Sequence, residues 1–166
     1  MIKTHMSKQI VMAAACVAIV CSVARAFAED FTIVGPGGGG AMYHATISPH
    51  TPNEVMVACD MTGAYISHDG GRSWRMFNLR GAVHFFAFDP VQPRTLYAGT
   101  RALWRSTDDG NSWKMVWPIP STVRNILMSS DHADENIISD RNAMGEIVAL
   151  AIDPVDSHKL VAASVK

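Results

Sequence analysis

The chain contains the stretch Ser67-His-Asp-Gly-Gly-Arg-Ser-Trp74, and the same pattern returns as Ser106-Thr-Asp-Asp-Gly-Asn-Ser-Trp113. A Ser, an Asp, a Gly and a Trp keep the same spacing in both copies, which two unrelated loops would rarely share. The pattern therefore marks an internal repeat, and the sequence before each copy shows how long the repeat is.

The repeat begins well before each copy of this pattern. The run Glu54-Val-Met-Val-Ala58 matches Arg94-Thr-Leu-Tyr-Ala98, and Pro49 and Pro90 lie 25 and 23 residues before the two Trp residues. A third unit opens with Ala149-Leu-Ala-Ile-Asp-Pro154. Self-similarity with a period of roughly 40 residues, built from short apolar runs, is typical of β-propeller blades and related β-repeats.

Each unit divides into four short apolar runs separated by turn residues, as in a four-stranded antiparallel blade. The predicted fold class is therefore all-β: a β-propeller, incomplete at about two and a half blades. The predicted blades lie near residues 44–80, 84–118 and 147–166, with a loop insertion over residues 119–146. Because propellers close with roughly four to eight blades, we expect an N-terminal part of a longer protein. A short protein that closes a ring by oligomerising is the alternative.

The repeated pattern suits a tight turn between the third and fourth strands of a blade. Its Asp can accept hydrogen bonds from backbone amides just downstream, and its Ser can do so more weakly. Its Gly supplies a positive φ, and its Trp starts the next strand with a ring that we expect to be buried. Folding thus explains all four residues of each copy, which are Ser67, Asp69, Gly71 and Trp74 in the first and Ser106, Asp108, Gly110 and Trp113 in the second.

These turns give the chain its resemblance to the Asp-box (BNR-repeat) propellers. That group includes sialidases, sortilin-type receptor ectodomains and the xyloglucan-cleaving enzymes of glycoside hydrolase family 74. The resemblance covers about residues 31–166. It implies the fold more than any activity, because one scaffold carries many kinds of site.

Residues 1–28 have the layout of a secretory signal peptide. Lys3 and Lys8 precede an apolar run over residues 10–23 that is too short for a comfortable membrane span, and Ala26-Phe-Ala28 is a small-x-small cleavage site. We expect cleavage after Ala28 and a secreted or periplasmic protein without membrane attachment. A glycine-rich lead segment, residues 29–43, then precedes the first blade.

Composition excludes some partners of the processed chain. Without the leader, 11 basic and 15 acidic residues give a formal net charge of −4, and no basic stripe predicts a nucleic-acid partner. Cys59 is then the sole cysteine, so no internal disulfide forms, and its apolar neighbours predict a small buried side chain. No cofactor is predicted, because the glycine run over residues 37–40 lacks the strand-to-helix context of a phosphate-binding loop.

The likeness to glycoside hydrolase family 74 becomes more specific at Asp60. Members of that family open with a run of glycines, then a strand ending in proline, then an Asp followed by x-Gly-Gly-Ala-Tyr. Here residues 37–40, Pro49, and Asp60 with Gly63-Ala-Tyr65 fall in that order, although Thr62 replaces the first Gly of the pair. The resemblance implies that Asp60 is the base of an inverting cleavage whose partner acid lies in a second propeller. A turn-capping role toward Gly63 is the alternative.

Two histidines and one acidic segment are the remaining candidates. His44 and His84 lie near the starts of innermost strands, where side chains approach the central channel, and are candidates for substrate binding. Residues 129–142 are rich in oxygen ligands of the kind that Ca²⁺ prefers. Their spacing fits no calcium loop, and a solvated loop explains them as well. No metal site is therefore predicted.

The predicted function is a carbohydrate-active role of the family 74 type, cleaving or binding a β-glucan-type polysaccharide. The alternative is a non-catalytic binding propeller, sortilin-like or assembly-factor-like. Sialidase activity is less well supported, because the chain lacks the Arg-Ile/Leu-Pro motif and the arginines with which sialidases clamp the sugar carboxylate. Besides a polysaccharide or glycan, the other expected partner is the remainder of a longer chain.

Overall fold

The computed structural model describes residues 32–61, 63–128, 135–140 and 146–165. All of its strands lie within Val34–Lys166, which forms one compact unit of the chain. The predicted leader, residues 1–28, lies outside the described residues. No helix in the described part of the chain is long and apolar enough to cross a membrane.

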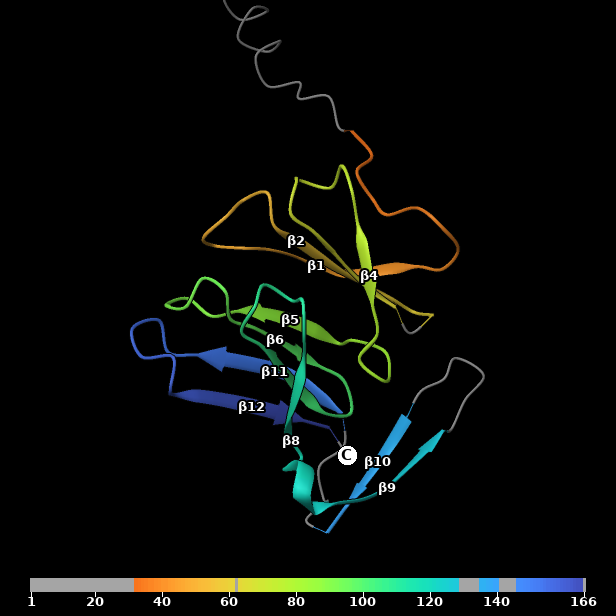
Figure 1. Cartoon of the computed structure of the whole chain (residues 1–166), viewed down its shortest axis with the longest axis vertical. Helices are drawn as coiled ribbons and strands as arrows, with labels where there is room; N and C mark the ends of the chain where they lie inside the picture. Colours follow the sequence, from red (N-terminus) through yellow and green to blue (C-terminus); the bar gives the residue numbers. More distant parts are fainter. Residues whose placement is uncertain (1–31, 62, 129–134, 141–145, 166) are drawn as a thin grey trace, which may run out of the picture. The chain divides into compact units, whose positions relative to one another are not determined.

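Two four-stranded antiparallel sheets make up most of the fold (Figure 1). The first sheet contains, in spatial order, β1 (Met42–Ile47), β2 (Val55–Cys59), β3 (Ala64–Ser67) and β4 (Arg75–Phe77). The second sheet contains, in spatial order, β5 (Phe85–Phe88), β6 (Leu96–Gly99), β7 (Leu103–Ser106) and β8 (Lys114–Trp117). Each strand pairs with the next one along the chain, as in a propeller blade.

Two more antiparallel pairs follow the sheets. The short 3-10 turn η1 (Pro120–Thr122) leads into β9 (Val123–Met128), which pairs with β10 (Glu135–Ser139). The strand β11 (Ile147–Ile152) pairs with β12 (Leu160–Ser164) in the region of the third predicted blade. The described residues contain no α-helix, so the predicted all-β fold class of four-stranded antiparallel blades is confirmed.

The register of the strands gives each four-stranded sheet two distinct ends. Met42 at the start of β1 pairs with Cys59 at the end of β2, so the β2–β3 connection lies where β1 begins. We call this the loop end; in the second sheet it holds the start of β5 and the β6–β7 connection. The opposite end, which we call the turn end, holds the two repeat turns, residues 67–74 and 106–113.

The apolar core lies on both faces of the second sheet. One cluster joins it to the first sheet and includes Met56, Ile66 and Leu96. The other joins it to β11 through Tyr97 and Ile147. Successive side chains of a strand point to opposite faces, so β6 sends Leu96 into one cluster and Tyr97 into the other. The second sheet is therefore packed on both faces, as a blade within a stack is.

The first repeat turn is closed by its Ser and its Asp. The amide of Gly71 donates to Ser67 Oγ at 2.8 Å, and the amide of Ser73 donates to Asp69 Oδ1 at 2.9 Å. Hydrogen bonds from the Ser73 side chain and amide hold the pKa of Asp69 at about 2, below its usual value. A depressed folded-state pKa stabilises the turn above the unfolded pKa, and this stabilisation is lost as the pH falls through about 2.

The second repeat turn has the same geometry. The amide of Gly110 donates to Ser106 Oγ at 2.9 Å, and the amide of Ser112 donates to Asp108 Oδ1 at 2.8 Å. Bonds from Ser112 hold the pKa of Asp108 at about 2. The turn glycines have a positive φ of 87° in the first turn and 71° in the second, a conformation that resists a Cβ.

The two Trp residues are half-buried, so their rings are buried only in part. The Trp113 ring stacks on Phe77 of the first sheet, with centroids 5.4 Å apart and planes 12° apart. The Trp74 indole donates to the carbonyls of Val34 and Gly71, at 2.8 and 3.0 Å.

The ladders also correct the alignment of the repeats. Val55 pairs with Ser67, and Leu96 pairs with Ser106, so Val55 corresponds to Leu96 rather than to Thr95. Between the last pair of the β2–β3 ladder, Ala58 and Ala64, the chain then has five residues, 59–63, whereas between the last pair of the β6–β7 ladder, Gly99 and Leu103, it has three, 100–102. The first sheet therefore has two additional residues at its loop end, in the connection that carries Asp60.

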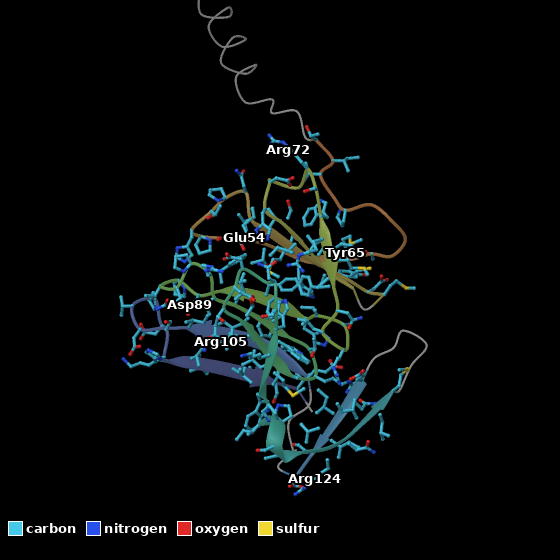
Figure 2. The ribbon with its side chains drawn as sticks, in the orientation of Figure 1. Glu54, Tyr65, Arg72, Asp89, Arg105 and Arg124 are labelled. Atoms are coloured by element: carbon cyan, nitrogen blue, oxygen red, sulfur yellow. The ribbon has the colours of Figure 1, made fainter. Side chains whose placement is uncertain are left out.

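The insertion over residues 119–146 is partly a hairpin rather than a loop. The strands β9 and β10 pair over Val123–Met128 and Glu135–Ser139. Arg124 forms an ion pair with Asp140 at one end of this hairpin, with Arg124 Nε donating to Asp140 Oδ1 at 2.6 Å (Figure 2). Most of the acidic segment 129–142, the calcium candidate, lies outside the described residues.

Two buried carboxylates lie at the turn end, Glu54 before β2 and Asp89 after β5 (Figure 2). Glu54 is 5% exposed and Asp89 is 1% exposed. Within the described part of the chain, Glu54 Oε1 and Asp89 Oδ2 have no hydrogen-bond partner. His68 Nδ1 lies 3.8 Å from Glu54 Oε1. Burial is the main cause that raises the pKa of Glu54 above its usual value.

We expect Glu54→Gln to stabilise the protein at pH 7, by about 1 kcal/mol, because burial disfavours the charged carboxylate and Gln carries no charge. A raised folded-state pKa contributes stability below the unfolded value, and that contribution is lost as the pH rises through the folded value. The buried charge of Glu54 therefore lowers the stability of the folded protein at neutral pH, and Gln removes that charge. Denaturant melts at pH 4 and pH 7 measure the difference, which should shrink at pH 4. A loss of stability at pH 7 would contradict this account.

Candidate functional site

Asp60 lies at the loop end of the first sheet, directly after β2, and its side chain is exposed. Its Oδ1 accepts a hydrogen bond from the amide of Ala41 at 2.9 Å, and its own amide donates to the Ala41 carbonyl at 3.2 Å. The amide of Cys59 donates to the carbonyl of Gly63 at 2.9 Å and closes the base of the connection. One oxygen of the carboxylate thus anchors the glycine-rich lead segment beside β2.

Gly40 makes this anchorage sterically feasible. A Cβ at this position would lie 2.7 Å from Asp60 Oδ1 and 2.8 Å from Cys59 Sγ, closer than real Cβ contacts. Gly40 also has a φ of 105°, which favours glycine. The lead segment therefore needs glycine here for its close approach to Asp60. Cys59 itself is buried, as its apolar neighbours predict.

A second polar cluster lies at the loop end and centres on Glu146, the residue before β11. His84 Nε2 lies 3.4 Å from Glu146 Oε2, and Arg101 Nη2 lies 3.4 Å from Glu146 Oε1. Backbone bonds hold the segments that carry these side chains: the amide of His84 donates to the carbonyl of Gly99 at 2.8 Å, and the amide of Ile147 donates to the carbonyl of Thr100 at 2.8 Å. All three side chains are partly exposed. The cluster offers ligands both donors and acceptors.

The structure separates the roles of the two candidate histidines. His84 belongs to the cluster with Glu146. His44 lies at an irregularity of the β1–β2 ladder, between Tyr43 and Thr46, with a φ of 55°. Its side chain is exposed, and its ring lies 6.2 Å from the Tyr43 ring. His44 therefore forms an exposed aromatic pair with Tyr43, whereas His84 belongs to the Glu146 cluster.

Of the residues predicted from sequence, His84 and Asp60 lie at the loop end, and Arg101 and Glu146, which lie there too, were not among the predicted site residues. Arg101 belongs to the β6–β7 connection and Glu146 follows the insertion, so no local motif links them. Among the described residues, no group of three or more His, Cys, Asp or Glu side chains is arranged to hold a metal ion.

Comparisons with known proteins give a structural likeness. No family model matches the chain, and no curated protein matches it either. Among solved structures, an ancestral GH74 enzyme is 20% identical over 51% of this chain, with a TM-score of 0.43. The GH74 xyloglucanase from Xanthomonas campestris is 18% identical over 74% of this chain, with a TM-score of 0.39. The chain spans 14% and 26% of the lengths of these two proteins.

Proposed function

We propose that this chain is part of an exported Asp-box propeller of the glycoside hydrolase family 74 type, which acts on a β-glucan-type polysaccharide. In this proposal Asp60 is the general base. The observation that carries it is the two-residue extension of the β2–β3 connection relative to the β6–β7 connection. Loops that depart from a repeated scaffold often build its binding face, and this one exposes a carboxylate.

The chemistry of the loop end supports the proposal. Inverting hydrolysis needs a base that activates water on one side of the glycosidic bond and an acid on the other, with the carboxyl groups roughly 6.5–9.5 Å apart. Asp60 supplies an exposed carboxylate with Oδ1 anchored by Ala41. The partner acid then belongs to another part of the enzyme, as the family resemblance implies. His84 and Arg101, with Glu146 between them, add hydrogen-bonding groups for sugar hydroxyls.

A binding propeller without catalysis is the second candidate. The Glu146 cluster favours it, because such a cluster binds hydroxyl groups whether or not a bond is cleaved. The test incubates the full-length protein with xyloglucan and related β-glucans, and measures both binding and the release of reducing sugar. Release of sugar supports the hydrolase, and binding without release supports the binding propeller. If the protein neither binds these glucans nor releases sugar from them, both candidate functions are contradicted.

Export forms part of the same proposal. We expect the processed protein to begin at Glu29, because Ala26 and Ala28 are the small residues that leader peptidases require. Intact-mass analysis of the exported protein measures its first residue. Replacing the small side chain in Ala26→Asp should leave the leader attached and serves as the control. A protein that is exported with Met1 still in place would contradict this expectation.

A further inference from the structure

Val34 of the lead segment sits on the first repeat turn. The indole of Trp74 donates to the Val34 carbonyl at 2.8 Å. A Cβ on Gly71 would lie 2.9 Å from both the Cβ and the carbonyl oxygen of Val34. Val34 therefore fills the hollow that the missing side chain of Gly71 leaves. The pattern of the turn, with its Ser, Asp, Gly and Trp, does not by itself call for this contact.

The second repeat turn is covered in a similar way, but by the first sheet. A Cβ on Gly110 would lie 3.1 Å from the Cδ1 of Ile66. Arg75 Nη2 donates to the Gly110 carbonyl at 2.7 Å, and Phe77 stacks on the Trp of that turn. In both turns a branched aliphatic side chain lies against the turn glycine. Val34 thus lies against the first turn in the position that Ile66 occupies against the second turn.

We propose that the first repeat turn is a docking site for a peptide segment that presents a branched aliphatic side chain and a free carbonyl, and that Val34 fills it in cis. The glycine hollow accepts the side chain, and the Trp74 indole binds the carbonyl. Exposure agrees with a contact that begins at Val34, because Ile33 is 98% exposed, Val34 is 50% exposed and Pro36 is half-buried. The lead segment thus acts as a strap, and the same segment supplied as a separate peptide binds only when Val34 leaves.

The neighbouring residue provides a matched control for this proposal. In the full chain, Val34→Gly removes the side chain that fills the hollow, and Ile33→Gly makes the same change at an exposed position. Exchange of the indole N–H protons, followed by NMR, reports on each turn separately. We expect Val34→Gly to speed exchange at Trp74 roughly fivefold to tenfold, the equivalent of one net hydrogen bond. Trp113 should be unaffected, and Ile33→Gly should change neither indole.

The second step supplies the missing segment in trans. A synthetic peptide covering residues 32–37 is added to each variant at about 1 mM, a concentration that detects weak binding. It should restore protection of Trp74 and shift its indole signal in Val34→Gly, and do neither in the unmodified chain. Val34→Ala guards against a variant that loosens the fold. The proposal is overturned if exchange at Trp74 is unchanged in Val34→Gly, or if Ile33→Gly has an equal effect. It is also overturned if the peptide produces no response, or if exchange at Trp113 becomes faster in both Val34 variants.

Discussion

Replacing Trp113 with Ala is expected to lower the free energy of unfolding by about 3 kcal/mol, the lower limit for truncating a buried aromatic side chain, because this ring is half-buried. The ring stacks on Phe77 of the first sheet, and its indole donates to the Gly110 carbonyl at 3.2 Å. The substitution therefore removes contacts within the second turn and contacts between the two sheets at the same time.

Denaturant melts of the full chain measure this loss, and Trp74→Ala is the matched control. We expect Trp74→Ala to cost about 1–2 kcal/mol, since Val34 rather than a sheet covers that ring. A double-mutant cycle between Trp113 and Phe77 isolates the stacking contribution, which should be about 0.5–1.5 kcal/mol. Equal losses for the two Trp variants, or no coupling to Phe77, would show that the stack does not join the sheets.

The repeat turns could be predicted from sequence because their geometry is local. Asp69 and Ser67 bind amides that lie no more than four residues away, and Gly71 supplies the positive φ that such a turn needs. What covers each turn could not be predicted. Val34 and the Trp74 indole are 40 residues apart, and their contact depends on where the lead segment runs.

The register of the second strands was mispredicted for a physical reason. Four of the five residues of β2 and all four of β6 are buried, so these strands present apolar side chains on both faces. Continuous apolar runs carry no alternation, and the alternation is what fixes register in a half-exposed strand. Matching Ala58 to Ala98 therefore hid the true correspondence and the two additional residues beside Asp60.

The hairpin in the insertion was missed because it interrupts the repeat. Its strands contain Ile126 and Ile137, which pair across the ladder, and Ile137 packs against the larger apolar cluster. The amide of Glu135 donates to the carbonyl of Arg80, and their side chains form an ion pair at 3.1 Å. These contacts link the insertion to the connection between β4 and β5, a tertiary effect that the spacing of polar residues does not reveal.

The largest expected effect on activity comes from Asp60→Asn, which should lower turnover of a β-glucan by roughly 10²–10⁴-fold, because it removes the base that activates water. Asn keeps an oxygen that can accept the hydrogen bond from the Ala41 amide, so the lead segment stays anchored and the melting midpoint should change little. Asp60→Ala removes the acceptor as well, and it should lower both turnover and the melting midpoint. The pair of variants thus separates the catalytic role from the anchoring role.

Asp156→Asn is the matched control, because Asp156 lies in the β11–β12 connection and pairs with Lys159. It makes the same change of charge and should leave turnover unchanged. Turnover is measured as reducing sugar released by the full-length protein, and folding as the melting midpoint of the same samples. If Asp60→Asn keeps full turnover, Asp60 serves as an anchor of the lead segment and the base lies elsewhere. If both Asp60 variants lose stability equally, charge rather than hydrogen bonding holds the lead segment in place.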